Sequence, residues 1–112
     1  MADCIFCGIV AGDVPATIVD TADGAVAFED VNPKAPVHVL VIPREHLTDV
    51  HAIRDGDLLV TMHDLAQKVA RDRGVADSGY RLVFNLGPDA GQSVFHAHLH
   101  VLGGRSLAWP PG

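Results

Sequence analysis

A strict alternation of histidine and apolar residues near the C-terminus restricts how this chain folds more than any other feature. Residues 96–102 read His-Ala-His-Leu-His-Val-Leu, with a histidine at every second position over the first five. A period of two is the side-chain period of a β-strand. The pattern therefore predicts a strand over Phe95–Leu102, with the three histidines on one face and the intervening apolar residues on the other.

The histidine row is expected to carry chemistry as well as structure, because imidazole can act as nucleophile, acid, base or metal ligand near neutral pH. A strand rises about 3.3 Å per residue, so the outer two histidines are expected about 13 Å apart at Cα. Two neighbours could share a metal ion, whereas all three could not without a sharp bend. The row therefore favours an elongated site in which His96, His98 and His100 hold different parts of an extended anionic substrate.

Size and charge limit the class of protein. The length of 112 residues predicts a single domain over residues 1–112. A net charge of −6 argues against binding a nucleic acid polymer, which needs a basic face, but not against binding a single nucleotide. No apolar run reaches the roughly 18 residues of a membrane span, and the N-terminus lacks the basic segment of a signal peptide. We therefore expect a cytoplasmic protein without a membrane partner, in which the two cysteines form no structural disulfide.

Hydrophobic patterning predicts two helices and five strands. A short helix is expected over Asp3–Ala11 with Asp3 as its N-cap, and a long one over Asp55–Arg73, capped by Asp55 and ended by Gly74. The expected strands cover residues 17–20, 25–29, 37–43, 79–86 and 95–102, with a turn at residues 21–24. Hairpins dominate and only one long helix lies between strands, so we predict an α+β fold with an antiparallel sheet.

A glycine-containing loop, residues 87–93, runs directly into the histidine strand. Gly87 and Gly91 permit positive φ and a close approach of the backbone. Successive amides from Gly91 to Val94 could form an anion-binding nest, and Ser93 could donate to a phosphate or to a leaving group. An ordinary hairpin loop is the alternative interpretation.

Phosphate at such a loop indicates a specific chemistry, because a neutral imidazole can attack phosphorus to give a phosphohistidine. His98, at the centre of the row, is the expected nucleophile, and His100 the expected donor to non-bridging oxygens. For His38, on an apolar strand, the pattern alone favours a buried structural histidine. Asp30 could bind ribose hydroxyls beside a stacked base, although Asp before Asn-Pro also favours a turn.

The pair Cys4 and Cys7 has the spacing Cys-x-x-Cys, which leaves three interpretations open. The pair could be half of a zinc site completed by His46 and His96. It could be a redox dithiol, although such motifs normally follow a strand in a βαβ unit, which is absent here. It could also be two free thiols. A zinc ion would clamp the N-terminal segment onto the sheet, a cross-link that helps a small domain.

These motifs resemble the histidine triad proteins, and within them the Hint branch of nucleotide-binding proteins. The row at residues 96–102 matches the signature of alternating histidine and apolar residues throughout. Supporting stretches lie at residues 27–30, 35–38, 40–43, 79–81, 91–93 and 103–105, and the ending at residues 109–112, Trp-Pro-Pro-Gly, is also Hint-like. The resemblance covers nearly the whole chain in order.

The resemblance implies a homodimeric hydrolase of purine nucleoside 5′-phosphoramidates, such as adenosine phosphoramidate and adenylated lysine. It assigns the nucleophile to His98 and the α-phosphate contact to His100, while His38 and His96 orient the triad and help move protons. Ser93 would contact the phosphate or the leaving nitrogen. The implied nucleotide-binding residues are Phe6, Ile9, Val14, Phe28, Asp30, Val31, Asn85, Gly91, Ser93, Val94, His98, His100 and Trp109, the last reaching the partner subunit's site.

Two departures from the Hint pattern affect these expectations. Leu86, Pro88 and Ala90 stand where many Hint loops have an acidic residue and an extra glycine, which bears on leaving-group preference. The cysteine pair is absent from many Hint proteins but occurs in bacterial ones that bind zinc through the equivalents of Cys4, Cys7, His46 and His96. Zinc would then be structural, with no cofactor for catalysis. A dinucleoside polyphosphate hydrolase, and a nucleotide-binding scaffold with vestigial catalysis, are the alternative functions.

Overall fold

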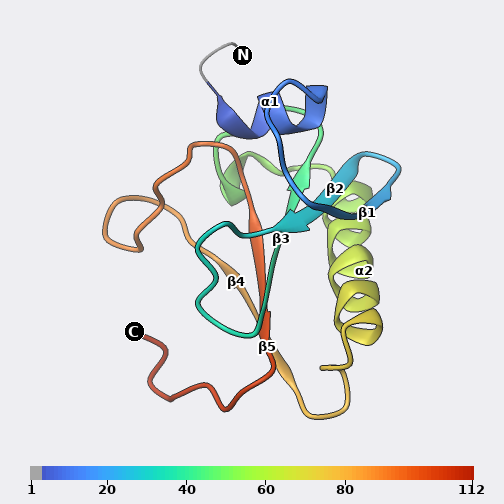
Figure 1. Ribbon diagram of the computed structural model, residues 1–112. Helices are drawn as coiled ribbons and strands as arrows, with labels where there is room; N and C mark the ends of the chain where they lie inside the picture. The colour runs from blue at the N-terminus through green and yellow to red at the C-terminus, as the bar shows by residue number, and fades with distance from the viewer. Residues whose placement is uncertain (1–3) are drawn as a thin grey trace.

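The computed structural model describes residues 4–112 and shows a five-stranded antiparallel sheet with strand order β1-β2-β3-β5-β4 (Figure 1). The elements are α1 (Ile5–Ala11), β1 (Ile18–Ala22), β2 (Ala25–Glu29), β3 (Val37–Pro43), a 3₁₀ turn (Val50–Ala52), α2 (Gly56–Asp72), β4 (Tyr80–Phe84) and β5 (Leu99–Gly103). The predicted α+β fold, with one long and one short helix, is confirmed. Among the described residues no helix combines the length and apolar character needed to cross a bilayer.

The two faces of the sheet bury two different clusters. Odd-numbered residues of β3 and β5, such as Val39 and Val101, pack with Met62 and its neighbours of α2 in the larger core. The alternate residues of β2 and β3, such as Phe28 and Leu40, pack with Phe6 of α1 in a smaller cluster. Successive strand side chains point to opposite faces, so α1 and α2 cover opposite sides of the sheet. His100, opposite Leu40 in the ladder, lies on the α1 side.

The prediction that all three histidines belong to one strand is wrong, because β5 begins only at Leu99. The ladder pairs Leu99 with Val41, so continuing it two residues further would join Ala97 to Pro43. Pro43 has no N–H to donate, and β3 ends there. The Ala97 amide instead donates to the Leu47 carbonyl at 2.6 Å. His96 and His98 therefore lie in an irregular segment whose alternation of buried faces nevertheless persists, with Ala97 in the larger core.

The other element boundaries differ by a few residues. β2 and β3 have the predicted bounds, and Asp55 caps α2 as expected by accepting hydrogen bonds from two amides of its first turn. β1 extends to Ala22, which shortens the predicted turn, and β4 is shorter than expected at both ends. The N-cap of α1 is Cys4, whose sulfur accepts from the Cys7 amide. The cap predicted at Asp3 lies outside the described residues.

Candidate active site

His38 of β3, His100 of β5 and His98 of the segment just before β5 meet on the α1 side of the sheet. The ring centroids of His98 and His100 are 5.0 Å apart, and those of His38 and His100 are 5.1 Å apart. His38 lies on β3 and points to the same face as His100, since residues two apart on a strand share a face. His38 and His98 are buried, and His100 is half-buried. The buried His38 is therefore part of the histidine group and not an isolated core residue.

Hydrogen bonds fix the proton positions along the pair His38 and His100. The Lys34 amide donates to Nδ1 of His38 at 3.0 Å, so Nε2 carries the ring proton of neutral His38. That Nε2 lies 2.8 Å from Nδ1 of His100, which must accept. The ring proton of neutral His100 is then on its Nε2, which is buried without a hydrogen-bond partner among the described residues. An unpartnered buried donor is costly unless a ligand completes it, so His100 is prepared to bind an acceptor such as a phosphate oxygen.

His98 has the opposite arrangement of its ring nitrogens. Its Nδ1 lies 2.7 Å from the carbonyl oxygen of His96, and a carbonyl can only accept, so Nδ1 carries the proton. Nε2 of His98 then holds a lone pair and no proton, as a nucleophile requires. The Phe6 ring packs edge-on against His98 with centroids 5.2 Å apart, which restricts the orientation of the imidazole.

The surroundings keep His38 and His100 neutral near pH 7. Burial, followed by the nearby His98 and His38, lowers the pKa of His100 to about 4. Burial likewise lowers the pKa of His38, against the opposing effect of the Asp30 carboxylate. The Asp30 Oδ2 lies 3.4 Å from Nε2 of His38. Neutral imidazoles are the forms that the hydrogen-bond pattern requires.

Cys4, Cys7, His46 and His96 bring four donor atoms within 4.8 Å of one another. Nδ1 of His46 lies 3.2 Å from Cys7 Sγ, and Nδ1 of His96 lies 3.4 Å from Cys4 Sγ and 3.6 Å from Cys7 Sγ. Tetrahedral zinc with ordinary bond lengths puts a nitrogen and a sulfur ligand about 3.6 Å apart. The donor set and its spacing therefore fit zinc.

Both ring nitrogens of His96 are occupied away from the histidine group. Nε2 donates to the Pro43 carbonyl at 2.8 Å, which leaves the lone pair on Nδ1 directed at the sulfurs. The His96 side chain is fully buried. These contacts leave neither nitrogen of His96 free to exchange a proton with a substrate, which favours the expected role as a zinc ligand over the expected role in moving protons.

A second group of donor atoms, from Asp30, His38 and His100, is equally close. It does not fit a metal ion, because the Lys34 amide occupies Nδ1 of His38 and so keeps a proton on the nitrogen that faces His100. A metal ligand must present a lone pair. His38 and His100 are instead hydrogen-bonded to each other, and the Asp30 carboxylate lies 3.4 Å from Nε2 of His38.

Only some of the residues expected to hold a nucleoside lie next to one another in the structure. Phe6 and Phe28 share the smaller cluster, with Ile9 and Val94 packed against it, and the two phenylalanine rings meet edge-on at 5.4 Å. Asp30 follows β2 beside this cluster; its Oδ1 accepts from the Asn32 amide, so it forms the expected turn as well. The remaining residues lie elsewhere: Val14 packs against Gly8, Val31 is 86% exposed, and Asn85 and Trp109 line a separate groove beside β4.

The loop before the histidines offers fewer free amides than predicted. The Gly91 amide donates to the Pro88 carbonyl and the Gln92 amide to the Gly87 carbonyl, so the proposed nest of four amides is wrong. The amides of Ser93 and Val94 have no internal acceptor among the described residues. The sequence pattern gives no sign that Gln92 matters, yet its side chain is buried and fully bonded. Its Oε1 accepts from the Gly87 amide, and its Nε2 donates to the carbonyls of Thr48 and Val94. It fixes the loop that carries Ser93.

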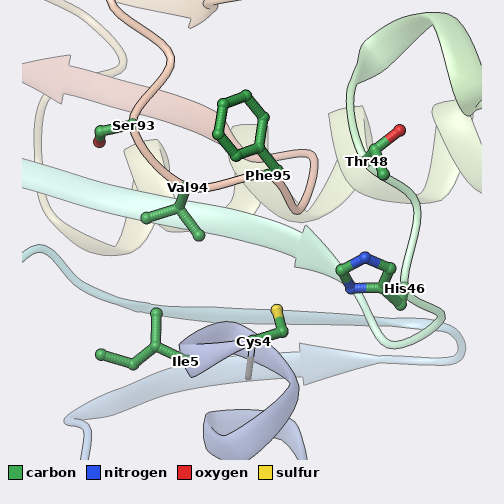
Figure 2. Close-up of a pocket in the computed structure, with 7 residues that line it drawn as sticks. All are labelled: Cys4, Ile5, His46, Thr48, Ser93, Val94 and Phe95. Carbon is green, nitrogen blue, oxygen red and sulfur yellow. The ribbon is translucent and has the colours of Figure 1, made fainter. Parts of the chain in front are cut away.

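A cavity of about 360 Å³ lies between α1 and the segment 93–95 (Figure 2). Ile5, Val94 and Phe95 supply apolar walls, and Cys4 and His46 of the cysteine–histidine cluster lie at one end, with Ser93 at the other, as Figure 2 shows. The cavity therefore borders both the cysteine–histidine cluster and the loop that leads to the histidine group.

Comparison with known proteins identifies the family. The HIT domain model matches residues 11–107. The chain belongs to the HIT family. The structure matches a HIT family hydrolase from Legionella pneumophila with a TM-score of 0.94 and 44% identity, over 98% of this chain and all of that one. Two relatives are each 41% identical. The 14 kDa zinc-binding protein of Brassica juncea aligns over 98% of this chain and 100% of its own length. Adenylylsulfatase HINT1 of Arabidopsis thaliana aligns over 96% of this chain and 76% of its own length.

Proposed function

We propose that this HIT protein hydrolyses purine nucleoside 5′-phosphoramidates through a covalent nucleotidyl-histidine at His98. The observation that carries the proposal is the complementary protonation of two adjacent rings. His98 has an unprotonated Nε2 because its Nδ1 donates to the His96 carbonyl, and His100 has an unpartnered buried Nε2–H. Attack on phosphorus requires a nucleophile with a free lone pair, which His98 supplies. It also requires a hydrogen-bond donor to the phosphate oxygens, which His100 supplies.

In the first step Nε2 of His98 attacks the α-phosphorus and the phosphorus–nitrogen bond breaks. The leaving amine takes up one proton from solvent, and Ser93, which is exposed at the end of its loop, is proposed to donate a hydrogen bond to the phosphate or to that nitrogen. Water then attacks phosphorus, the bond from phosphorus to Nε2 of His98 breaks, and one proton of the water returns to solvent, so the nucleoside monophosphate is released and the free imidazole is restored. His100 donates to a non-bridging oxygen in both steps, and its hydrogen bond from His38 fixes which nitrogen donates. No step is assigned to a metal.

The apolar cluster around Phe6 and Phe28 supports binding of a purine base beside the reacting histidines. Asp30, at the edge of this cluster, is proposed to accept hydrogen bonds from the ribose hydroxyls. The free amides of Ser93 and Val94 would complete the phosphate end. Ile9, which packs against the same cluster, is proposed to border the base. The contacts expected from Val14, Val31, Asn85 and Gly91 stay predictions.

We further propose that Cys4, Cys7, His46 and His96 hold a structural zinc ion. The donor set is thiolate and imidazole, the distances match tetrahedral geometry, and a relative is named for zinc binding. Zinc here would join α1 to the loop after β3 and to the segment before β5. The zinc ion would hold His96 directly, as a ligand. It would also hold Phe6 in place, because Phe6 lies between the two cysteine ligands in the sequence.

A homodimer is proposed through the open edge of the sheet. β4 is an edge strand, and beside it Leu59, Val60, His63, Leu82, Phe84 and Leu99 line an apolar cavity of about 380 Å³. The neighbouring Leu59 and Val60 are 40% and 58% exposed, so this lining extends into an apolar surface that a lone subunit leaves in water. A second copy of the chain would cover this surface, and the exposed Trp109 is proposed to reach the partner subunit's nucleotide site.

The test compares four substrates on the purified protein and on a His98→Asn variant: adenosine phosphoramidate, adenylated lysine, a diadenosine polyphosphate and adenosine 5′-phosphosulfate. The proposal predicts that the phosphoramidates have the highest kcat/KM and that the folded variant loses at least 1000-fold activity. A higher kcat/KM for diadenosine polyphosphate or for the phosphosulfate would contradict the proposed substrate class. Tight nucleotide binding with no hydrolysis of any of the four substrates would show that the protein is a nucleotide-binding protein and not an enzyme.

A further inference from the structure

Arg105, just after β5, makes a contact that the proposed reaction does not yet use. It follows Gly103 and Gly104, and its Nη2 donates to the Lys34 carbonyl at 2.7 Å while its Nη1 donates to the Ser106 carbonyl at 2.9 Å. Lys34 lies in the connection between β2 and β3, 71 residues earlier in the chain. Arg105 thus ties the end of the strand that carries His100 to the loop that precedes His38.

The backbone around Arg105 is shaped for this contact. Gly104 has φ of +92°, a conformation that favours glycine, and a Cβ at Gly104 would lie 2.9 Å from Pro36 Cβ. The chain therefore passes directly over the loop 31–36, and only glycine allows so close an approach. Among residues 4–112, Arg105 is the sole side chain from outside 30–38 with a hydrogen bond to this loop.

The same Lys34 sets the proton position on His38. Its N–H donates to His38 Nδ1, its C=O accepts from Arg105, and its side chain is exposed. Holding the carbonyl restricts rotation of the Lys34 backbone and so keeps the amide aimed at the imidazole. Without that amide, the proton of His38 can move to Nδ1, and the bond between His38 Nε2 and His100 Nδ1 then reverses. His100 would lose the proton on the nitrogen that faces the substrate.

We propose that Arg105 is a positioning residue that, through Lys34, fixes the tautomers of His38 and His100 and thereby keeps His100 a donor to the phosphate. The expected effect of Arg105 on turnover rests on the proposed function. Its expected effect on the tautomers of His38 and His100 does not, because that effect is present in the protein without substrate.

The experiment uses uniformly ¹⁵N-labelled protein with Arg105→Gln, Arg105→Lys and the control Arg54→Gln. Arg54 is also exposed, and its side chain makes no hydrogen bond or ion pair among the described residues. Long-range ¹H–¹⁵N spectra of the histidine rings, assigned with single-histidine substitutions, report which nitrogen is protonated. Turnover of adenosine phosphoramidate gives kcat and KM on the same samples, and thermal melts report folding.

We expect wild-type His38 protonated at Nε2, a mixture of tautomers in Arg105→Gln, and recovery in Arg105→Lys, which keeps a charged donor. In Arg105→Gln kcat should fall about tenfold with KM changed less than twofold, a smaller loss than removing a donor to the transition state outright. Arg54→Gln should match wild type. An Arg105→Gln spectrum identical to wild type overturns the inference whatever the activity, as does an equal loss in Arg54→Gln. Absence of any wild-type turnover would instead contradict the proposed function and leave the tautomer result to decide the role of Arg105.

Discussion

The His96 carbonyl accepts a hydrogen bond from Nδ1 of His98 at 2.7 Å, while Nδ1 of the His96 ring lies 3.4 Å from Sγ of Cys4 in the cysteine–histidine cluster. One residue therefore joins the candidate metal centre to the proposed nucleophile: its ring faces the sulfurs and its backbone fixes the nucleophile's tautomer. Phe6 makes a second connection, because it lies between the two cysteines in the sequence and its ring contacts both His96 and His98.

Loss of the metal should therefore affect both stability and turnover. Cys7→Ser is expected to abolish binding of one zinc per chain and to lower Tm by about 8 °C or more, corresponding to about 2 kcal/mol in a domain of this size. Elemental analysis and calorimetry measure the two effects. His51→Gln, an exposed histidine outside the cluster, is the control and should keep both zinc and Tm. A full equivalent of zinc in Cys7→Ser would contradict this assignment.

The lowered pKa of His100 makes stability depend on pH in a predictable direction. In the folded protein the pKa is about 4, against an ordinary value of 6.5, so below pH 6.5 the unfolded chain binds a proton that the folded one does not. This contribution to stability is therefore present above pH 6.5 and is lost as the pH falls toward 4. Between pH 7 and pH 5 wild type should lose about 2 kcal/mol more than His100→Gln in urea unfolding. Parallel loss in both proteins would show that His100 is not the group responsible.

Asp30 is expected to act on nucleotide binding more than on chemistry. Asp30→Asn removes the anionic acceptor proposed for the ribose and should raise KM for adenosine phosphoramidate about tenfold, with kcat within threefold. Steady-state kinetics and an AMP titration by calorimetry check this. Asp64→Asn, on the exposed surface of α2, provides the control. A fall in kcat with an unchanged KM would instead assign Asp30 to orienting His38, whose Nε2 lies 3.4 Å from its carboxylate.

The dimer prediction depends on the apolar surface beside β4. Val60→Glu puts a charge into a surface that a second copy is proposed to bury and should convert a dimer into a monomer. Sedimentation velocity at micromolar concentrations measures this, with Arg71→Glu on the exposed part of α2 as control. A wild-type protein that sediments as a monomer would contradict the proposed dimer.

The sequence predicts some parts of this molecule well for identifiable physical reasons. The apolar runs of β2 and β3 specify buried strands with the correct bounds, and the 3.6-residue stripe with Asp55 specifies α2. The alternation of histidine and apolar residues starts at His96, but pairing with β3 starts only at Leu99. Periodicity alone therefore predicts a strand that begins too early. Pro43, which ends that pairing, lies more than 50 residues away, where local pattern has no information.

The site is predicted in its residue types but not in its connections. Cysteine and histidine spacing picks out the four residues of the candidate zinc site, and the histidine row with its loop picks out the proposed reacting group. The features that determine proton positions are backbone groups: the Lys34 amide and the carbonyls of His96 and Pro43. Every residue has a backbone carbonyl and every residue but proline has an N–H, so only the tertiary structure shows which of these groups act.

Intact-protein mass spectrometry during turnover of adenosine phosphoramidate tests the central claim most directly. The account predicts a transient adduct of one AMP per chain on wild type, and its absence from His98→Asn that retains the wild-type Tm. An adduct that persists in His98→Asn, or AMP release by that variant at the wild-type rate, would contradict His98 as the nucleophile.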